Sequence, residues 1–255
     1  MTNGPFDLSG RRAFISGASR GIGRAIASAL NAAGAETILC GRDRGELEHT
    51  LSGLPNAATG SRVVELDVTR EDAVTAWFGA EREQGRSPDI VVNNAGIIDR
   101  SGLFDSRTDT WRKVLDVNLN AAYVVSREAA RSMVARKSGR IIMIASILGL
   151  QGKRAALAYT ASKHGMIGLA RALAAELGPD GITANAICPG YIKTEINLAL
   201  QRDAAYDAKV RSMTPAGRWG MPDEVAQSVV FLASDAAAYV NGHALVVDGG
   251  MTATH

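Results

Sequence analysis

The sequence is poor in residues that cross-link a chain covalently or through metals. Its 255 residues include only two cysteines, Cys40 and Cys188, and these have no CxxC spacing. The four histidines are scattered without metal spacing: His49, His164, His243 and His255. We therefore expect reduced, buried thiols, no metal site and no catalytic histidine.

Large charge excess and long apolar runs are also missing. The formal net charge is only +2, which gives no general reason to expect a nucleic acid or membrane partner. No apolar run reaches the length of a membrane span, and residues 1–17 lack the apolar core of a signal peptide. We expect a cytoplasmic protein. The densest basic stretch, 131–140, is interpreted as the solvated end of a helix.

Short apolar runs alternate with amphipathic segments along nearly the whole chain. Strand–helix–strand repetition requires parallel pairing, and strands without polar alternation are typical of a sheet covered on both faces. We predict a single domain over residues 1–255, a Rossmann-type doubly wound α/β fold with a seven-stranded parallel sheet. The expected strands are 11–16, 36–40, 62–66, 89–93, 140–146, 182–188 and 244–247. The clearest helical segments are 23–34, 71–84, 108–137 and 157–178.

Two segments interrupt this alternation. Gly-Pro-Asp-Gly at 178–181 is expected to end the preceding helix, with glycine and proline as stop signals. Residues 191–222 stand where a crossover helix is expected but are longer and irregular. Long insertions after a strand are usually functional loops, so we predict a substrate lid there.

A glycine-rich loop, SGASRGIG at 16–23, follows the first expected strand and opens the first helix. Gly17, Gly21 and Gly23 would let a pyrophosphate approach the backbone at the helix N-terminus, where free N–H groups and the dipole favour an anion. The sequence therefore predicts a dinucleotide site at this loop.

Tyr159 and Lys163 lie four residues apart in an expected helix, about 6 Å apart on one face. A nearby ammonium lowers the pKa of a phenol, so the pair is either an acid–base device or ordinary packing. Ser146 ends a strand, where it could cap a helix or donate to a reacting oxygen. Asn118 is a poor helix-interior residue, which indicates local deformation and a held water.

The GxxxGxG loop, NNAG at 93–96, Asn118, Ser146, Tyr159, Lys163 and ICPGYIKT at 187–194 resemble the short-chain dehydrogenase/reductase family in order and spacing. The resemblance covers nearly the whole chain. It implies an enzyme that moves hydride between a nicotinamide cofactor and a carbonyl or alcohol carbon.

The resemblance also implies roles for individual residues. Tyr159 becomes the general acid or base, Ser146 a donor to the substrate oxygen, and Asn118 (rather than Asn120) part of a proton relay through water to Lys163. Lys163 also holds the ribose, and Asn93 is mainly structural. The implied cofactor contacts are Gly17, Ser19, Arg20, Gly21, Ile22, Gly23, Asp67, Val68, Asn94, Ala95, Gly96, Tyr159, Lys163, Pro189, Gly190, Ile192 and Thr194. For Asp67, a turn or helix-cap role stays open.

The residues after the second strand bear on which nicotinamide is used. Gly41 stands where an acidic residue would meet the ribose of NAD, and Arg42 follows it. A guanidinium from Arg42, with Arg20 in the glycine loop, suits the 2′-phosphate of NADP. We predict NADP as the preferred cofactor, with NAD possible because Asp43 lies nearby.

Substrate and assembly are less constrained. NAGIIDR, PGYIKTE and TPAGRWGMPDE resemble the gluconate 5-dehydrogenases and related sugar-acid enzymes of the family. Arg100, Lys153 and Arg154 are candidate partners of a substrate carboxylate, or solvated loop charges. A 3-oxoacyl thioester reductase, a broad ketone reductase and a non-catalytic nucleotide-binding regulator remain alternatives. The resemblance further implies a homotetramer.

Overall fold

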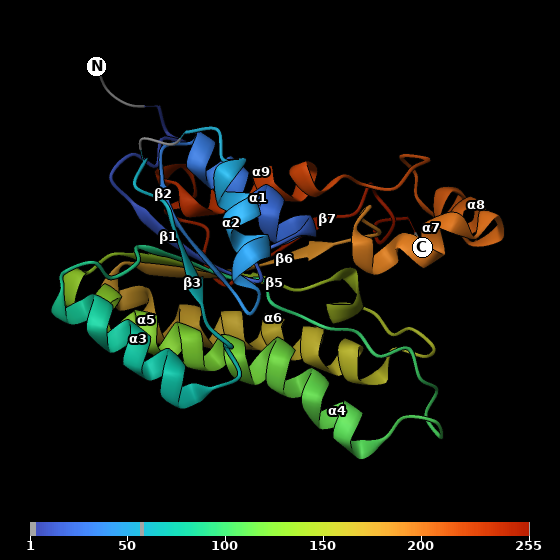
Figure 1. Cartoon of the computed structure of the whole chain (residues 1–255). Helices are drawn as coiled ribbons and strands as arrows, with labels where there is room; N and C mark the ends of the chain where they lie inside the picture. The colour runs from blue at the N-terminus through green and yellow to red at the C-terminus, as the bar shows by residue number, and fades with distance from the viewer. Residues whose placement is uncertain (1–3, 57–58, 255) are drawn as a thin grey trace.

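Seven parallel strands form one sheet in the order β3-β2-β1-β4-β5-β6-β7 (Figure 1). The computed structural model describes residues 4–56 and 59–254. The strands are β1 Arg12–Ser16, β2 Glu36–Gly41, β3 Arg62–Glu65, β4 Ile90–Asn93, β5 Gly139–Ile144, β6 Ile182–Pro189 and β7 Ala244–Val247. The order reverses between β1 and β4, which is where ligands bind in open α/β sheets. The predicted strands and fold class are confirmed.

Helices cover both faces of the sheet (Figure 1). On one face lie α1 Gly21–Ala32, α2 Arg44–Ser52 and α9 Pro222–Ala233. On the other lie α3 Glu71–Glu83, α4 Thr108–Leu115, α5 Ala121–Arg136 and α6 Leu157–Leu177. Helices α2 and α9 were not among the segments singled out from the sequence. Helix α2 is short and largely polar, so it carries no clear apolar stripe.

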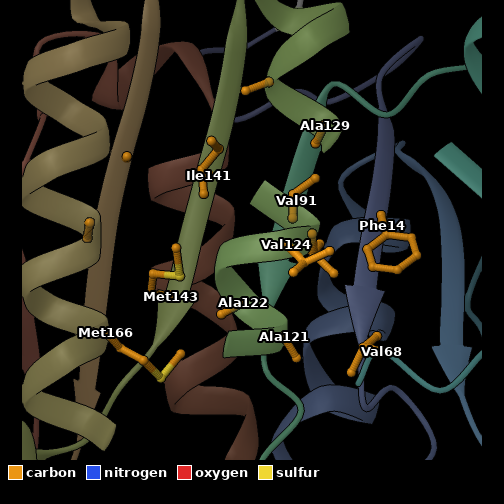
Figure 2. Packing of buried hydrophobic residues seen from close by; sticks show 14 of the residues in the cluster. Phe14, Val68, Val91, Ala121, Ala122, Val124, Ala129, Ile141, Met143 and Met166 are labelled. Atoms are coloured by element: carbon orange, nitrogen blue, oxygen red, sulfur yellow. The ribbon is translucent and has the colours of Figure 1, made fainter. Parts of the chain in front are cut away.

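Two apolar layers separate the sheet from its helices. In the layer drawn in Figure 2, Phe14, Val91 and Ile141 on the strands pack against α5 and α6. Phe14 also contacts the rings of Trp77 and Phe78 from α3. Every residue of β5 and β6 is buried, which explains why these runs lack polar alternation.

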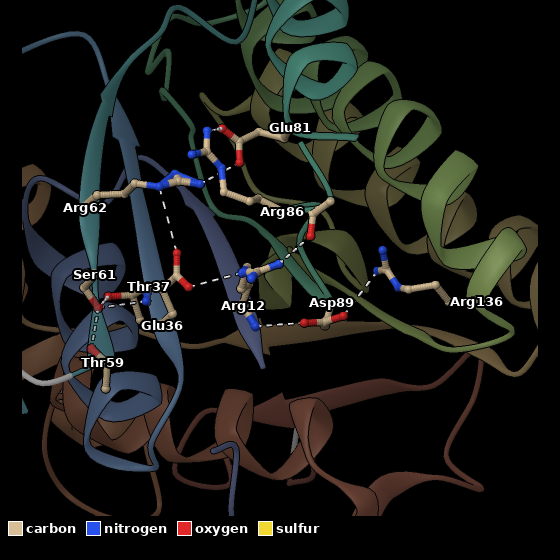
Figure 3. Close-up of polar contacts among 11 residues, drawn as sticks. Arg12, Glu36, Thr37, Thr59, Ser61, Arg62, Glu81, Arg86, Asp89 and Arg136 are labelled. Atoms are coloured by element: carbon tan, nitrogen blue, oxygen red, sulfur yellow. Dashed lines mark hydrogen bonds and ion pairs between the residues drawn. The ribbon is translucent and has the colours of Figure 1, made fainter. Parts of the chain in front are cut away.

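Charged side chains bind one another at the amino ends of the strands (Figure 3). The Arg12 side chain pairs with Glu36, and its backbone N–H donates to Asp89. Arg62 and Arg86 both pair with the buried Glu81 of α3. These groups neutralise one another at the edge opposite the strands' carboxyl ends, so this edge serves stability.

The segment expected as one helix over 108–137 is interrupted by a π-helical turn, Asp116–Asn120, between α4 and α5. The expected deformation at Asn118 is therefore confirmed. The basic stretch 131–140 ends α5 at Arg136, where Lys137 adopts left-handed backbone, but Arg140 is buried in β5.

Two expected loop details differ. Helix α6 ends at Leu177, yet Gly178 is right-handed and Pro179 continues a 3-10 turn, so Gly181 at φ 72° supplies the left-handed stop. The segment 191–222 is more regular than expected. It contains α7 Leu198–Arg202 and α8 Ala204–Met213, the buried Trp219 is part of it, and α9 begins at Pro222.

Candidate active site

A cleft of about 420 Å³ opens at the carboxyl ends of the strands. All the predicted cofactor contacts line it, together with Ser146, Tyr159 and Lys163. Asn118 lies directly behind its wall, because a side chain at the cleft residue Gly96 would stand 3.4 Å from Asn118 Oδ1 and 3.7 Å from Lys163 Nζ. Wall residues that the sequence did not single out include Thr69, Ile97, Ile98, Lys113, Val117, Glu195 and Asn197.

The glycine loop is built for close backbone approach. Gly17 has φ 67°, and a Cβ on Gly23 would stand 2.0 Å from the carbonyl oxygen of Gly17. Helix α1 begins at Gly21, with Arg20 as its N-cap residue and no side chain bonded to the cap. Free N–H groups and an open backbone therefore meet at the α1 N-terminus, which fits a pyrophosphate.

Two neighbours hold this loop in place. The Asn94 amide donates to the carbonyl oxygens of Ser16 and Gly17, at 2.9 and 3.0 Å. Arg24, which sequence reasoning missed, donates to the carbonyl oxygen of Ser19 at 2.6 Å. Asn93 instead donates to Ser126 inside the core, in agreement with a structural role.

The region predicted for the adenosine ribose is lined by Arg20, Gly41 and Arg42. The Asp67 carboxylate accepts hydrogen bonds from the backbone N–H and the hydroxyl of Thr69; these bonds outweigh the effect of partial burial and, with a smaller contribution from the Arg42 charge, lower the pKa of Asp67. Asp67 thus holds a turn and lines the cleft. Asp43 is the N-cap residue of α2, and its carboxylate accepts a hydrogen bond from the Glu46 N–H. The carboxylate considered as a partner for the ribose of NAD is therefore already engaged.

Ser146 and Tyr159 meet in the cleft wall. Ser146 Oγ accepts from the Leu148 N–H at 3.1 Å, so the cap role is present, and its own O–H stays available to donate. The pKa of Tyr159 lies above its ordinary value, because burial outweighs hydrogen bonding with Ser146 and the field of Arg100. The phenol is therefore protonated near neutral pH.

The expectation that Lys163 depresses the pKa of Tyr159 is wrong for this structure. Lys163 is buried, and its ammonium donates to the Ile144 carbonyl at 2.6 Å. Its Nζ lies 5.4 Å from the centroid of the Tyr159 ring. Burial lowers the pKa of Lys163 itself to about 8. The lysine lies beside the phenol, but desolvation controls the titration of both groups.

The fully buried Asn118 braces the segment after β4. Its Oδ1 accepts from the Ile97 N–H at 2.8 Å, and its Nδ2 donates to the Ile97 carbonyl and to Ser162 Oγ, both at 3.0 Å. Both amide N–H donors are used in this way. Asn120 binds Asp116 at the surface, so Asn118 is the inward residue, as expected.

The segment after β6 passes close to the end of β7. A Cβ on Gly190 would stand 2.8 Å from Asp248 Cβ, so only glycine fits without movement. Ile192 is buried, and its carbonyl accepts from Asn197 Nδ2 at 3.1 Å. That carbonyl is therefore already engaged, and the Ile192 N–H and Thr194 hydroxyl are the groups left for a cofactor amide.

The three basic candidates for substrate binding behave differently. Arg100 donates to Asn197 Oδ1 at 3.2 Å. Lys153 donates to the phenols of Tyr191 and Tyr206, which sequence reasoning missed because these tyrosines lie far along the chain. All three side chains are exposed, and none of them is among the residues that line the cleft.

Other expectations concern groups outside the cleft chemistry. Cys40 and Cys188 are free and buried, as predicted. Across residues 4–56 and 59–254, no group of three His, Cys, Asp or Glu side chains is placed to hold a metal. His164 is exposed on α6, and His255 lies outside the described residues. No helix among the described residues has the length and apolar character needed to cross a membrane.

Comparison with known proteins identifies relatives over nearly the full length. A family model described as enoyl-(acyl carrier protein) reductase matches residues 17–252. The chain is 41% identical to a 2-dehydro-3-deoxy-D-gluconate 5-dehydrogenase of Pseudoalteromonas atlantica, over 96% of this chain and 97% of that one. It is 38% identical to the 3-oxoacyl-[acyl-carrier-protein] reductase FabG of Vibrio harveyi, over 96% and 98%.

A solved relative has the same fold. The gluconate 5-dehydrogenase of Burkholderia cenocepacia, in complex with NADP and tartrate, superposes with a TM-score of 0.94 at 36% identity, over 98% of each chain. Taken with the glycine loop, the switch-point cleft and the Ser146–Tyr159–Lys163 group, these matches show that the chain is an oxidoreductase of the short-chain dehydrogenase/reductase family.

Proposed function

We propose that the chain is an NADP(H)-dependent oxidoreductase that interconverts a carbonyl and a secondary alcohol on a sugar acid such as gluconate or 5-ketogluconate. The observation that carries the proposal is that Ser146, Tyr159 and Lys163 share one cleft with the glycine loop. A bound NADP(H) supplies or accepts the hydride. Sugar-acid relatives at 41% and 36% identity support the substrate class.

The proton chemistry belongs to Tyr159. Its raised pKa keeps the phenol protonated near neutral pH, ready to donate to the oxygen of a ketone during reduction. Ser146 Oγ is held by the Leu148 N–H, which leaves its proton to stabilise charge on the same oxygen. Asn118 positions Ile97 and Ser162 through its side-chain amide, and it also takes part in a proton relay through water to Lys163.

Groups on several loops would hold the cofactor. The α1 N-terminus, with Gly17, Ser19, Gly21, Ile22 and Gly23, would take the pyrophosphate, and Lys163 the ribose next to the nicotinamide. Arg20 and Arg42 would pair with the 2′-phosphate, which makes NADP preferred over NAD. Asp67 and Val68 would border the adenine, and Asn94, Ala95 and Gly96 would border another part of the cofactor. Pro189, Gly190, Ile192 and Thr194 would meet the nicotinamide amide.

A carboxylate on the substrate would meet positive charge at the mouth of the cleft. Arg100 is the best placed of the basic candidates, because its field reaches Tyr159 and it binds Asn197 in the cleft wall. Residues 191–222 would act as the lid. In contrast, Ile196 and Leu198 on that lid are exposed apolar side chains, which suit an acyl chain.

The main alternative is a 3-oxoacyl thioester reductase or broad ketone reductase, which the FabG relative supports at 38% identity. Steady-state reduction by NADPH of 5-ketogluconate, an acetoacetyl thioester and aryl ketones separates these functions. We expect the highest kcat/KM for 5-ketogluconate. A higher value for the thioester would favour the alternative, and NADPH binding without turnover of any compound would indicate a nucleotide-binding regulator.

We also propose that the single domain is cytoplasmic and assembles as a homotetramer. The resemblance implies subunit contacts on the long helices before and after Ser146. Trp111 and Tyr123 support this, because both are large side chains exposed on α4 and α5, at 37% and 48%. Light scattering on the purified chain tests the oligomeric state.

A further inference from the structure

A lysine and two tyrosines from distant segments form one polar cluster beside the lid. Lys153 Nζ donates to Tyr191 Oη at 2.6 Å and to Tyr206 Oη at 2.8 Å, and the two phenol oxygens are 3.0 Å apart. Lys153 lies between Ser146 and α6, Tyr191 follows β6, and Tyr206 is on α8. The cluster therefore joins the lid to the loop that leads into the Tyr159 helix.

The cluster rests on a rigid support. The Tyr191 ring packs edge-on against Trp219, with centroids 5.4 Å apart. Trp219 is buried, and its indole N–H donates to Asp207 on α8 at 2.7 Å. The phenols are therefore held in place by packing and by hydrogen bonds that do not involve Lys153.

Counting donors shows that the cluster is incomplete by itself. An ammonium has three N–H donors and each phenol has one O–H, which makes five. Two bonds go from Lys153 to the phenols, and one joins the phenols, so two donors remain. In the part of the chain that the structure describes, no Asp or Glu forms an ion pair with Lys153. A positive cluster with spare donors is suited to accept an anion.

Arg100 connects this cluster with the reacting end of the cleft. Burial raises the pKa of Tyr159 and the hydrogen bond from Lys153 lowers that of Tyr206; the charge of Arg100 makes a smaller, lowering contribution at both phenols, which places the guanidinium within electrostatic reach of them. It donates to Asn197, a residue of the cleft wall. Arg100 and Lys153 are exposed side chains beyond the residues that line the cleft, and Asn197 links Arg100 to the cleft wall.

We propose that Lys153, Tyr206 and Arg100 form a carboxylate subsite, which makes the substrate an acid whose carboxylate lies at the lid while its carbonyl meets Tyr159. Tyr191 is a positioning residue that holds Lys153 toward Tyr206. The inference rests on the proposed function.

The test compares Lys153→Met and Tyr206→Phe with the full-length wild type. For 5-ketogluconate, KM is expected to rise about tenfold or more in Lys153→Met, since a hydrogen bond to a charge is lost, while kcat changes little. A neutral ketose of equal chain length should show no such rise. The matched controls Lys209→Met, on the same α8 helix, and Tyr239→Phe, fully exposed, should behave like wild type.

Binding of tartrate supplies a readout that does not require turnover. Trp219 lies beside Tyr191, so tryptophan fluorescence should report the binding of tartrate to the wild type. Lys153→Met should bind tartrate about tenfold more weakly. Equal rises in KM for acid and neutral substrates would show that Lys153 only tethers the lid, and would overturn the subsite. Unchanged KM values in Lys153→Met, or no binding of tartrate by the wild type, would also overturn it. Carboxylate binding that needs Lys153, without turnover of any sugar acid, would instead keep the subsite and refute the proposed function.

Discussion

The ammonium nitrogen of Lys163 lies 2.6 Å from the carbonyl oxygen of Ile144, the last residue of β5. This bond ties the middle of α6 to the end of the strand that leads to Ser146. Tyr159 on α6 and Ser146 after β5 are therefore held in fixed relation by a buried charged group. The geometry of the proposed proton donor, Tyr159, depends on a lysine whose folded pKa is about 8.

Lys163 should make stability depend on pH. Its pKa is about 8 when folded against 10.5 unfolded, so the unfolded chain binds more protons between these values, and stability rises with pH there. From pH 8 to 9 the free energy of unfolding of wild type should rise by on the order of 1 kcal/mol relative to Lys163→Met.

Urea unfolding of both proteins at several pH values measures this difference. Cys40, Cys188 and Tyr159 have raised pKa values and act in the opposite direction as pH rises, but they are present in both proteins, so their effects cancel in the difference. A difference that stays flat or falls across this pH range would contradict the lowered pKa of Lys163.

Tyr159→Phe should bind the cofactor but lose nearly all turnover. Removal of a positioned general acid costs about 10²–10⁴-fold in rate, whereas the ring keeps its packing. Absorbance at the NADPH band measures the rate, and cofactor fluorescence measures binding. Wild-type-like rates would exclude Tyr159 as the proton donor.

Gly23→Ala should weaken cofactor binding and destabilise the fold. The new Cβ would lie 2.0 Å from Gly17 O and 2.5 Å from Asn94 Nδ2, and overpacking of this kind costs about 1–3 kcal/mol. Gly168→Ala on α6 is the matched control, because nothing lies within 4 Å and alanine is the better helix former. Thermal unfolding and NADPH titration should show a lower Tm and weaker NADPH binding in Gly23→Ala alone. Equal behaviour of the two variants would refute the close approach of Gly23 to Gly17.

Arg42→Asp should shift the cofactor preference from NADP toward NAD. A lost charge-assisted bond to the 2′-phosphate corresponds to about 10–100-fold in kcat/KM for NADP. Arg44→Ala, which removes only an exposed pair with Glu48, is the control. Higher efficiency with NAD in the wild type would show that Arg42 and Arg20 do not select the cofactor.

Much of the fold could be predicted because its signals are local. Strands buried on both faces are continuous apolar runs, and β6 is buried along its whole length. Helix α2 escaped because its short polar sequence has no apolar stripe. The end of α6 before Gly178 was predicted correctly, but the left-handed residue is Gly181, because Gly178 and Pro179 also fit a continuing 3-10 turn.

The candidate site divides in the same way. The residues of contiguous motifs were found, since the glycine loop and the Tyr159–Lys163 spacing are visible in one dimension. The Lys153–Tyr191–Tyr206 cluster joins positions up to 53 residues apart, and no local pattern indicates it. The direction of the Tyr159 pKa was mispredicted because desolvation depends on tertiary burial, which spacing does not report.

The π-helical turn at Asp116–Asn120 sets which face of the helix Asn118 occupies, so the register between α4 and α5 determines whether Asn118 meets Ile97. Such a turn accommodates one extra backbone residue relative to an α-helix. Deletion of a single residue there would let the two helices merge into one regular rod and rotate Asn118 about 100° away from Ile97. A shorter chain with a more regular helix would therefore lose the bonds by which Asn118 holds Ile97 at the cleft.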